Sequence, residues 1–525
     1  MKKTVKSILA GLTALTLVLT AAGCGDKGGN TSINKGSGEI PETLKIYAQL
    51  PTGLSALGAK SNNDVLTFQA MEELTGCHVE WVHPAQGTSG EKFNLMLVSG
   101  DLPDMIVSSW KGNGQTGEAY AEDGILIPLT ELIEENMPNL SAFLKERPDI
   151  KSQFTEPNGE IYYIPLMRKD EEMKIFRGPQ IREDWLKKLG LEIPKTPDDL
   201  YNVLKAFKTQ DPNGNGQADE IPMTGVKFSG TGFGVGDLLW MFGAYDGFYI
   251  KENGKVTYGV LEDAYVEGLE YITKLFKEGL IDQDFLLNDR SKMDTKFMND
   301  KAGFVFSYQP TKYYKNMNKD GKKVTGISHL AKPGVKNNVF DTNRLMDITN
   351  QSIAITTQNP NPAGSLKWLD NFFGGEGLDI YNYGVEGVSY DVINGEKIFK
   401  PEVLADNKYN LAVAANNSTW VGLQEWGYYK QILSPWGVEA IETWAKDEGV
   451  GGIIPPMIMF DTEERATITQ IQSQISTYVE EIINKIVIGK ASIDEIPKIR
   501  EQIKKMGIDQ IIDIYEAGLK RYNSR

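Results

Sequence analysis

Residues 44–107 alternate short strand-like segments with amphipathic helical ones, and this alternation limits the possible folds more than any other feature of the chain. The apolar spacing predicts strands at residues 44–48, 77–82 and 105–107, with helices at about 64–74 and 91–98 between them. This order is typical of a doubly wound α/β domain. Ligands of such domains bind beyond the carboxyl ends of the strands, so Trp110, shortly after the third strand, becomes a candidate ligand contact.

Later segments are mostly helical. Helices are expected at about residues 196–207, 264–278, 463–488 and 496–517. Thr196 is the expected N-cap of the first of these helices, with Pro197 at its first helical position. Gly507 is expected to interrupt the last helix, because glycine is a poor helix former.

The first 42 residues indicate export and anchoring. Lys2, Lys3 and Lys6 precede an apolar run at residues 8–19, which is too short for a lasting membrane span and is typical of a secretory signal. Thr20-Ala21-Ala22-Gly23 then leads to Cys24, an arrangement that resembles a bacterial lipobox in which Cys24 carries the lipid. We therefore expect a signal peptide at residues 1–23, followed by the lipidated cysteine and a polar, flexible tether at residues 24–42.

The charge balance excludes some partners. The 525-residue chain has a formal net charge of −16, and removal of residues 1–23 loses three lysines and no acids, which leaves −19. Such a surface repels nucleic acid, so no nucleic-acid partner is expected. Once Cys24 is lipidated, Cys77 is the only other cysteine and no disulfide within the chain can form. Alternation with Val79 places Cys77 on an apolar strand face, where we expect a small buried side chain.

Several segments resemble the extracellular solute-binding proteins, family 1, of ABC importers. These segments are FNLMLVSGDLPD at residues 93–104, NGEIYYIP at 158–165, IREDWLKKLGL at 181–191 followed by PKTP at 194–197, and YGVEG at 383–387. Residues 486–522 are similar to the larger subgroup that includes the alginate-binding proteins. The resemblance spans nearly the whole mature chain.

The resemblance implies an α/β, two-lobed periplasmic-binding-protein-like fold with a hinge and a central ligand cleft. We expect one lobe to contain residues 43–165 with about 290–360, and the other to contain 166–289 with about 361–525. It further implies a non-enzymatic, monomeric lipoprotein on the outer face of the bacterial cell membrane. Such a protein would capture an oligosaccharide and deliver it to the permease subunits of an ABC importer.

The loop at residues 211–220 carries the sharpest local chemistry. Oxygen-bearing side chains occupy loop positions 1, 3 and 5, a glycine occupies position 6, and the next residue can offer its carbonyl, as in an EF-hand. Position 12 is Pro222, so the closing carboxylate must come earlier, as in the compact calcium loop of the alginate-binding subgroup. We expect a structural Ca²⁺; the alternative is a plain turn. The expected ligands are Asp211, Asn213, Asn215, Gln217, Asp219 and Glu220.

Aromatic side chains are the candidate sugar contacts, because the apolar face of a sugar packs on a flat ring. Trp110 and Trp240 are the first choices. Trp420, Trp426 and Trp436, all within residues 418–437, are expected to form a second group. Trp81, Trp185 and Trp444 are better interpreted as core residues.

Three further residues are candidates for the cleft. Tyr308 follows the strand-like residues 304–306, where similar proteins often present ligand contacts. Glu386 resembles a cleft residue, although a hinge role is equally compatible with its position. Arg344 could bind a carboxylate if the sugar is acidic; a surface ion pair is the alternative.

Catalysis has little support in the sequence. The chain has three histidines, too few for a convincing zinc site or a Ser/His or Cys/His scheme. The glycines at 230, 232, 234 and 236 lack the spacing of a nucleotide-binding loop. Two alternatives stay open: a binding protein for a peptide or another small solute, and a calcium-dependent polysaccharide lyase or glycosidase.

Overall fold

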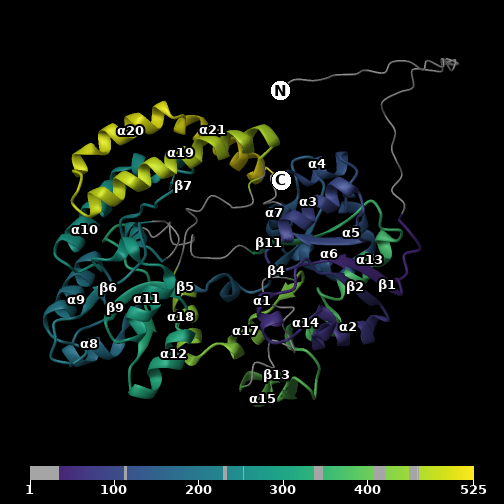
Figure 1. Ribbon diagram of the computed structural model, residues 1–525, viewed down its shortest axis with the longest axis horizontal. Coiled ribbons are helices and arrows are strands. Elements are labelled where there is room, and N and C mark those ends of the chain that lie inside the picture. Colours follow the sequence, from purple (N-terminus) through teal and green to yellow (C-terminus); the bar gives the residue numbers. More distant parts are fainter. Residues whose placement is uncertain are drawn as a thin grey trace, which may run out of the picture. The chain divides into compact units, whose positions relative to one another are not determined.

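The computed structural model describes residues 35–110, 115–228, 233–251, 253–335, 347–405, 420–447, 458 and 460–524. The chain divides into two units, Met1–Asn34 and Lys35–Arg525, each with contacts mainly within itself. Every helix and strand described below belongs to the second unit (Figure 1). The signal peptide and Cys24 lie outside the described residues.

The first sheet has six strands in the order β14-β4-β11-β3-β1-β2. β1 pairs in parallel with both β2 and β3, as the doubly wound pattern predicts, whereas β11 is antiparallel to β3 and β4. The strand bounds are β1 Thr43–Tyr47, β2 His78–Val82, β3 Met105–Ser108, β4 Ile164–Arg168, β11 Ile348–Ile355 and β14 Leu423–Gln424.

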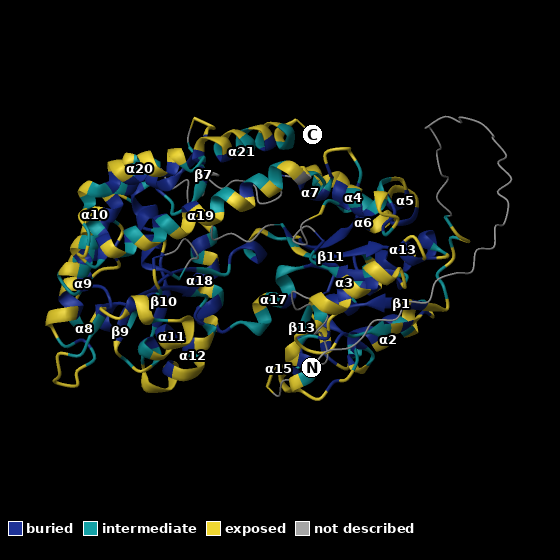
Figure 2. Cartoon of the chain, turned by 45° about the horizontal axis from the view of Figure 1, so that its top comes forward, coloured by how far each residue is buried: buried dark blue, intermediate teal, exposed yellow. Residues whose placement is uncertain are grey.

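Helices surround this sheet and bury its apolar strands (Figure 2). α13 packs on α5 and α14 packs on α2, so helices distant in the sequence become neighbours. The bounds are α1 Thr52–Ala56, α2 Leu66–Thr75, α3 Ser89–Ser99, α4 Gly117–Glu122, α5 Thr130–Asn136, α6 Pro138–Glu146, α7 Pro148–Phe154, α13 Pro362–Asp370 and α14 Gly375–Tyr383.

The second sheet has four strands in the order β10-β5-β9-β6. β9 pairs antiparallel with β5 and parallel with β6. The bounds are β5 Arg177–Arg182, β6 Ile221–Met223, β9 Ala302–Tyr308 and β10 Val324–Gly326. Two hairpins complete the strands, β7 Phe248–Ile250 with β8 Val256–Tyr258, and β12 Tyr390–Ile393 with β13 Glu396–Phe399.

The helices of the second sheet include the C-terminal ones. α9 and α11 pack on the sheet, α18 packs on β10, and α19 reaches α10 (Figure 1). The bounds are α8 Glu183–Leu189, α9 Pro197–Thr209, α10 Asp263–Lys277, α11 Arg290–Met298, α12 Thr311–Met317, α18 Pro435–Ala445, α19 Thr462–Val487, α20 Ile496–Lys505 and α21 Ile508–Asn523. α15 (Pro401–Ala405) follows the β12–β13 hairpin.

The chain passes between the two sheets three times, between β4 and β5, between β10 and β11, and between β14 and α18. The first passage contains the short helix η3 (Glu171–Lys174), and the third contains α17 (Trp426–Ile432). β9 and β10 belong to the second sheet and β11 to the first, so residues 290–360 contribute to both sheets. The expected division assigned that whole segment to the first lobe, and β-strand pairing divides it instead.

Local signals account for several helix boundaries. Thr196 caps α9 by accepting a hydrogen bond from the Asp199 N–H, and Pro197 opens the helix as predicted. Gly507 has φ +99° and separates α20 from α21, which confirms the expected interruption. Among the described residues, no helix combines the length and the apolar character needed to cross a bilayer.

Residues 35–39 are held against the body, which differs from the flexible tether expected up to residue 42. The Lys35 ammonium lies 2.7 Å from Glu135, and the Ala363 N–H donates to the Lys35 carbonyl. Asn361 accepts from the Gly38 N–H and donates to the Glu39 carbonyl. These contacts order the segment because they satisfy both its charge and its backbone groups.

Candidate functional site

Four of the predicted tryptophans are buried. Trp110 and Trp240 are each 1% exposed, and the Trp110 indole N–H donates to the Ile106 carbonyl. Trp420 and Trp436 are 2% and 7% exposed, whereas Trp426 is half-buried. In this arrangement the four buried rings present no open face for stacking, so their contact with a ligand stays a prediction.

The expected group of three C-terminal tryptophans is not assembled. Trp420 packs with Phe68, Trp81 and Phe372 beside the first sheet. Trp426 contacts Tyr429 within α17, while Trp436 packs edge-on against Tyr314. Closeness in sequence fails here because the chain passes from one sheet to the other between residues 424 and 435.

Trp81 departs from the expected core role, whereas Trp185 and Trp444 confirm it at 1% and 2% exposure. Trp81 is half-buried, stacks on His83 with a 6° angle between the rings, and donates to Asn63 at 2.7 Å. Cys77 is fully buried as predicted, and burial raises the pKa of its thiol to about 12.

A group of aromatic and arginine side chains surrounds Tyr308 at one end of the second sheet. We call it the Tyr308 cluster, and its members are Phe176, Arg177, Phe233, Arg290 and Tyr308. Arg177 opens β5 and pairs with Tyr308, the last residue of β9. The cluster therefore lies where the chain enters the second sheet from the first passage between the sheets.

The rings of the Tyr308 cluster contact one another closely. Phe176 stacks on Tyr308 with ring centroids 5.2 Å apart, and Phe233 meets the same ring edge-on at 4.9 Å. The Arg290 guanidinium carbon lies 3.9 Å from the centre of the Tyr308 ring. All five side chains are half-buried or exposed, so the cluster combines flat apolar surface with hydrogen-bond donors within reach of solvent.

The other two cleft candidates lie elsewhere. Glu386 is exposed in the turn after α14. It belongs neither to the Tyr308 cluster nor to the aromatic residues that pack around Trp420. Arg344, Gly230 and Gly232 lie outside the described residues. Of the predicted contacts, Tyr308 is thus the one that sits among several partly open aromatic and charged groups.

The acidic loop adopts turns that draw its oxygens inward. The Asp211 carboxylate accepts hydrogen bonds from the backbone N–H groups of Gly214, Asn215 and Gly216 at 2.9–3.1 Å. Gly216 has φ +73°, as the sharp turn at position 6 requires. The side-chain amides of Asn213 and Asn215 both converge on Oδ1 of Asp219, at 3.2 and 3.0 Å.

The remaining loop carboxylate is poorly satisfied. Oε1 of Glu220 is buried and accepts no hydrogen bond from the described residues. Burial, and then the charges of Asp211 and Asp219, raise the pKa of Glu220. A divalent cation among these oxygens would remove both penalties, so the donor chemistry fits Ca²⁺.

The described part of the chain contains no group of three or more His, Cys, Asp or Glu side chains placed to hold a metal. The loop would supply amide and backbone carbonyl oxygens in addition to carboxylates. Gln217, the expected carbonyl donor, is exposed on the loop.

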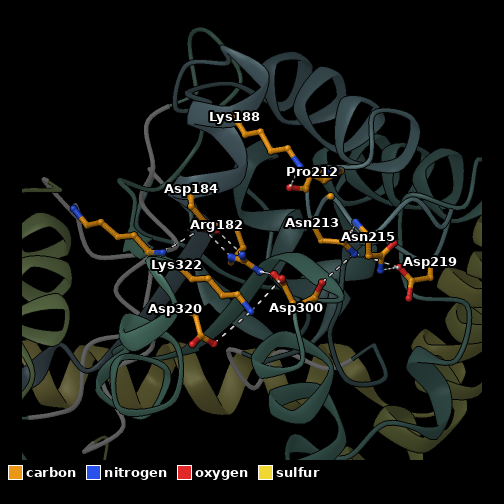
Figure 3. A network of polar contacts seen from close by, with 12 residues as sticks. Arg182, Asp184, Lys188, Pro212, Asn213, Asn215, Asp219, Asp300, Asp320 and Lys322 are labelled. Atoms are coloured by element: carbon orange, nitrogen blue, oxygen red, sulfur yellow. Dashed lines mark hydrogen bonds and ion pairs between the residues drawn. The ribbon is translucent and has the colours of Figure 1, made fainter.

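Polar contacts tie the loop to the second sheet (Figure 3). Lys188 donates to the carbonyls of Asp211 and Pro212, and Asn213 donates to the carbonyl of Asp300 at 3.3 Å. Asp300, held at φ +64°, in turn forms an ion pair with Arg182 of β5. The loop is thus connected through Asp300 to a buried arginine of the sheet.

Comparison with known proteins identifies relatives over most of the chain. The profile of the family described as bacterial extracellular solute-binding protein matches residues 55–377. The fructooligosaccharide ABC transporter substrate-binding protein FusA of Streptococcus pneumoniae is 34% identical over 370 residues, which cover 68% of this chain and 67% of FusA. Lipoprotein LipO of Bacillus subtilis is 30% identical over 383 residues, covering 71% and 72% of the two chains.

Solved structures show the same fold. The alginate-binding protein AlgQ2 without calcium ion superposes with a TM-score of 0.68 at 27% identity, over 93% of this chain and 100% of AlgQ2. An EF-hand mutant of FusA in complex with fructo-nystose gives a TM-score of 0.68 at 28% identity, over 92% and 99% of the two chains. These similarities confirm the predicted α/β fold of the two-lobed solute-binding proteins.

Sequence reasoning missed four members of the Tyr308 cluster: Phe176, Arg177, Phe233 and Arg290. Phe176 directly precedes a buried strand and Arg177 opens it, which is a usable signal for a position at the end of a strand. Phe233 and Arg290 carry no such signal, because only the packing of their segments brings them to Tyr308.

Proposed function

This chain belongs to the bacterial extracellular solute-binding protein family, which is non-enzymatic, and we propose that it captures an oligosaccharide for an ABC importer. The observation that carries the proposal is the 34% identity to a protein named for fructooligosaccharide transport. The Tyr308 cluster supports it, since flat rings beside hydrogen-bond donors suit a sugar.

The proposed mechanism is a shift between conformations. A sugar bound by groups of one lobe would gain further contacts from the other lobe only when the lobes approach, so binding would favour the closed form. The Tyr308 cluster lies beside the first passage between the sheets, where a small hinge movement changes which groups can meet. The permease subunits would then receive the ligand from the closed protein.

We further propose that the acidic loop binds Ca²⁺ through Asp211, Asn213, Asn215, Asp219 and Glu220, with the Gln217 carbonyl as a further ligand. The ion would be structural: it would neutralise three carboxylates and brace the loop against Asp300 and Arg182. The buried, unsatisfied oxygen of Glu220 supports this assignment.

The proposed location is outside the cytoplasm, held to the bacterial cell membrane by lipid on Cys24. LipO, a relative named as a lipoprotein, supports this proposal, as do the lipobox-like residues 20–24. We propose that the protein works as a monomer that delivers its sugar to the permease.

Calorimetric titration of the calcium-loaded protein against neutral and acidic oligosaccharides of graded length tests the proposed function. We expect one-to-one binding without release of new reducing ends or unsaturated products, with an optimum chain length. Heat from peptides alone would replace the sugar with a peptide ligand, and product formation would indicate a lyase or glycosidase. A panel without any binding sugar contradicts the proposal.

A further inference from the structure

Gln180 is a fully buried residue of β5, with 0% of its surface exposed. Its side-chain amide donates to the carbonyl of Ser307 at 3.0 Å and to that of Tyr308 at 2.7 Å. Both partners are acceptors, so the nitrogen of the amide must point toward them. Gln180 therefore fastens the last two residues of β9, the strand that carries Tyr308 into the Tyr308 cluster.

The end of β9 has a neighbouring strand on one side only. The register of β6 against β9 stops at Phe304, whereas β5 continues along β9 as far as Tyr308. Within the described ranges, residues 305–308 pair with β5 and with no other strand. A partly buried carbonyl at such a strand end needs a donor from elsewhere, and for Tyr308 the Gln180 amide is that donor.

Gln180 acts from the face of the sheet opposite to the Tyr308 ring. It is paired with Val305, and side chains alternate along a strand, so the ring of Tyr308, three residues further on, points to the other face. The face of Gln180 is covered by α18. Trp444 of this helix lies so close to Gly178, two residues before Gln180, that a Cβ at Gly178 would be 2.5 Å from the indole. A ligand on the Tyr308 ring would therefore not contact Gln180.

Stability alone is a poor reason for a glutamine at this position. Oε1 of Gln180 is buried and accepts no hydrogen bond from the described residues. An unsatisfied buried acceptor costs stability, and a long side chain also loses rotamer freedom when it is buried. Methionine would fill a similar space without that oxygen. What glutamine adds is the pair of hydrogen bonds that fixes the backbone at Tyr308.

We propose that Gln180 is a positioning residue for ligand binding, which holds the end of β9 so that the Tyr308 ring is in place before the sugar arrives. This inference rests on the proposed function and adds a residue that determines its affinity. A ring that is already fixed loses less freedom when a sugar packs on it, so the hydrogen bonds of Gln180 strengthen binding without any contact with the ligand. Phe176 and Phe233 pack on the same ring, so their placement depends on the same restraint.

The test measures sugar affinity on the full protein, produced with its own leader and purified in detergent. Fructooligosaccharides and uronic acid oligomers of graded length are titrated by calorimetry, and the sugar that wild type binds most tightly is the probe for the variants. Gln180→Met keeps the size of the side chain and removes the amide. We expect it to weaken binding of the probe by about tenfold, the loss that one or two hydrogen bonds produce.

A second variant and a control accompany this measurement. Gln180→Asn has an amide too short to reach both carbonyls, so it should also weaken binding, and it carries the same test if melting curves show the methionine variant to be unfolded. Asn136→Leu is the control. It removes a buried amide beside the first sheet that donates to the Leu132 carbonyl, so it should leave the affinity unchanged.

A double-mutant cycle shows whether Gln180 acts through Tyr308. Tyr308→Leu removes the flat ring and should itself weaken binding of the probe. Adding Gln180→Met to Tyr308→Leu should cause no further loss, because the ring that the amide positions is already absent. Losses that add would mean that the amide affects binding by another route.

Hydrogen exchange reports on the end of β9 directly. The Gln309 N–H donates to the Phe176 carbonyl at 2.8 Å, immediately after the last residue of β9. In Gln180→Met this amide should exchange several-fold faster than in wild type, and in Asn136→Leu it should exchange at the wild-type rate.

The outcomes separate the inference from the proposed function. Wild-type affinity in Gln180→Met overturns the inference and leaves the proposed function intact. Additive losses in the double variant overturn it as well, and so does an equal loss in Asn136→Leu. Failure of every sugar to bind wild type overturns the proposed function itself.

Discussion

Asn361 and Gly38 are joined by a hydrogen bond of 3.2 Å across 323 positions of sequence, and this contact fastens the N-terminal segment to the first turn of α13. The same side chain caps α13 by accepting from the Gly364 N–H. One asparagine therefore serves both a helix end and a separate segment of chain.

Asn361→Ala should release residues 35–39 and weaken α13. Loss of an N-cap costs about 0.5–2 kcal/mol, and the backbone groups of Gly38 and Glu39 lose their partner as well. Hydrogen–deuterium exchange of residues 35–39 should become faster, together with a lower melting temperature. Asn371→Ala, a change at a half-buried amide at the C-terminal end of the same helix, is the control, and equal exchange in the two variants would contradict the prediction.

Arg182→Met should destabilise the second sheet by about 3 kcal/mol. The Arg182 side chain is 1% exposed and forms ion pairs with Asp184 and Asp300, so its removal leaves two carboxylates without their main partner. Denaturant unfolding followed by tryptophan fluorescence measures the loss. Arg500→Met removes an exposed ion pair with Asp263 and should cost less than about 1 kcal/mol; a similar loss in both variants would refute the argument.

Asp246 should make stability fall as pH rises from about 4 to about 6. Burial raises the pKa of Asp246 from its ordinary 3.8 to about 6, so the folded protein keeps a proton that the unfolded chain has released. Across this window the folded state therefore loses up to about 3 kcal/mol. Asp246→Asn cannot titrate, and the difference in unfolding free energy between wild type and variant isolates the effect. A difference that does not change between pH 4 and pH 7 would count against it.

Calcium should raise the melting temperature through Glu220. A ligand at 100 times its Kd stabilises the folded state by about 2.7 kcal/mol, and loss of one carboxylate ligand should remove most of that gain. Glu220→Gln should melt at a temperature that hardly depends on calcium. Glu192→Gln, at an exposed position outside the loop, should keep the full shift, and an intact shift in Glu220→Gln would exclude the site.

Cys24→Ser should move the protein from the membrane fraction to the soluble fraction, because the variant lacks the thiol to which we propose that lipid is attached. Labelling of cells with radioactive palmitate, followed by fractionation, measures both effects. Cys77→Ser changes a buried thiol and should retain the label. Label on the Cys24→Ser protein would contradict lipidation at this residue.

Periodicity and capping chemistry predicted the elements well, because such signals are local. The Thr196 cap and the break at Gly507 follow from residues within a few positions of each other. The parallel pairing of β1 with β2 and β3 follows from the alternation of strands and helices over residues 44–107. The division of strands between the sheets was less predictable, since the position of β11 depends on pairing across more than 200 residues.

The candidate site was predicted only in part, for a similar reason. Tyr308 could be named from its position after a strand, but Arg290 reaches it only through the packing of α11. Trp110 and Trp240 show the converse: a large aromatic side chain can serve the core as well as a ligand site, and here both are buried.

The pairing of β11 with β3 has a consequence for how the protein matures. Ser352 and Ser108 are neighbours in the first sheet although 244 positions separate them, and β14, at the edge of that sheet, follows later still. The sheet cannot close until most of the chain has been synthesised, and pairings between such distant segments form slowly. Slow pairing of this kind would keep the chain unfolded during the export proposed above, and its final architecture would then arise on the far side of the membrane.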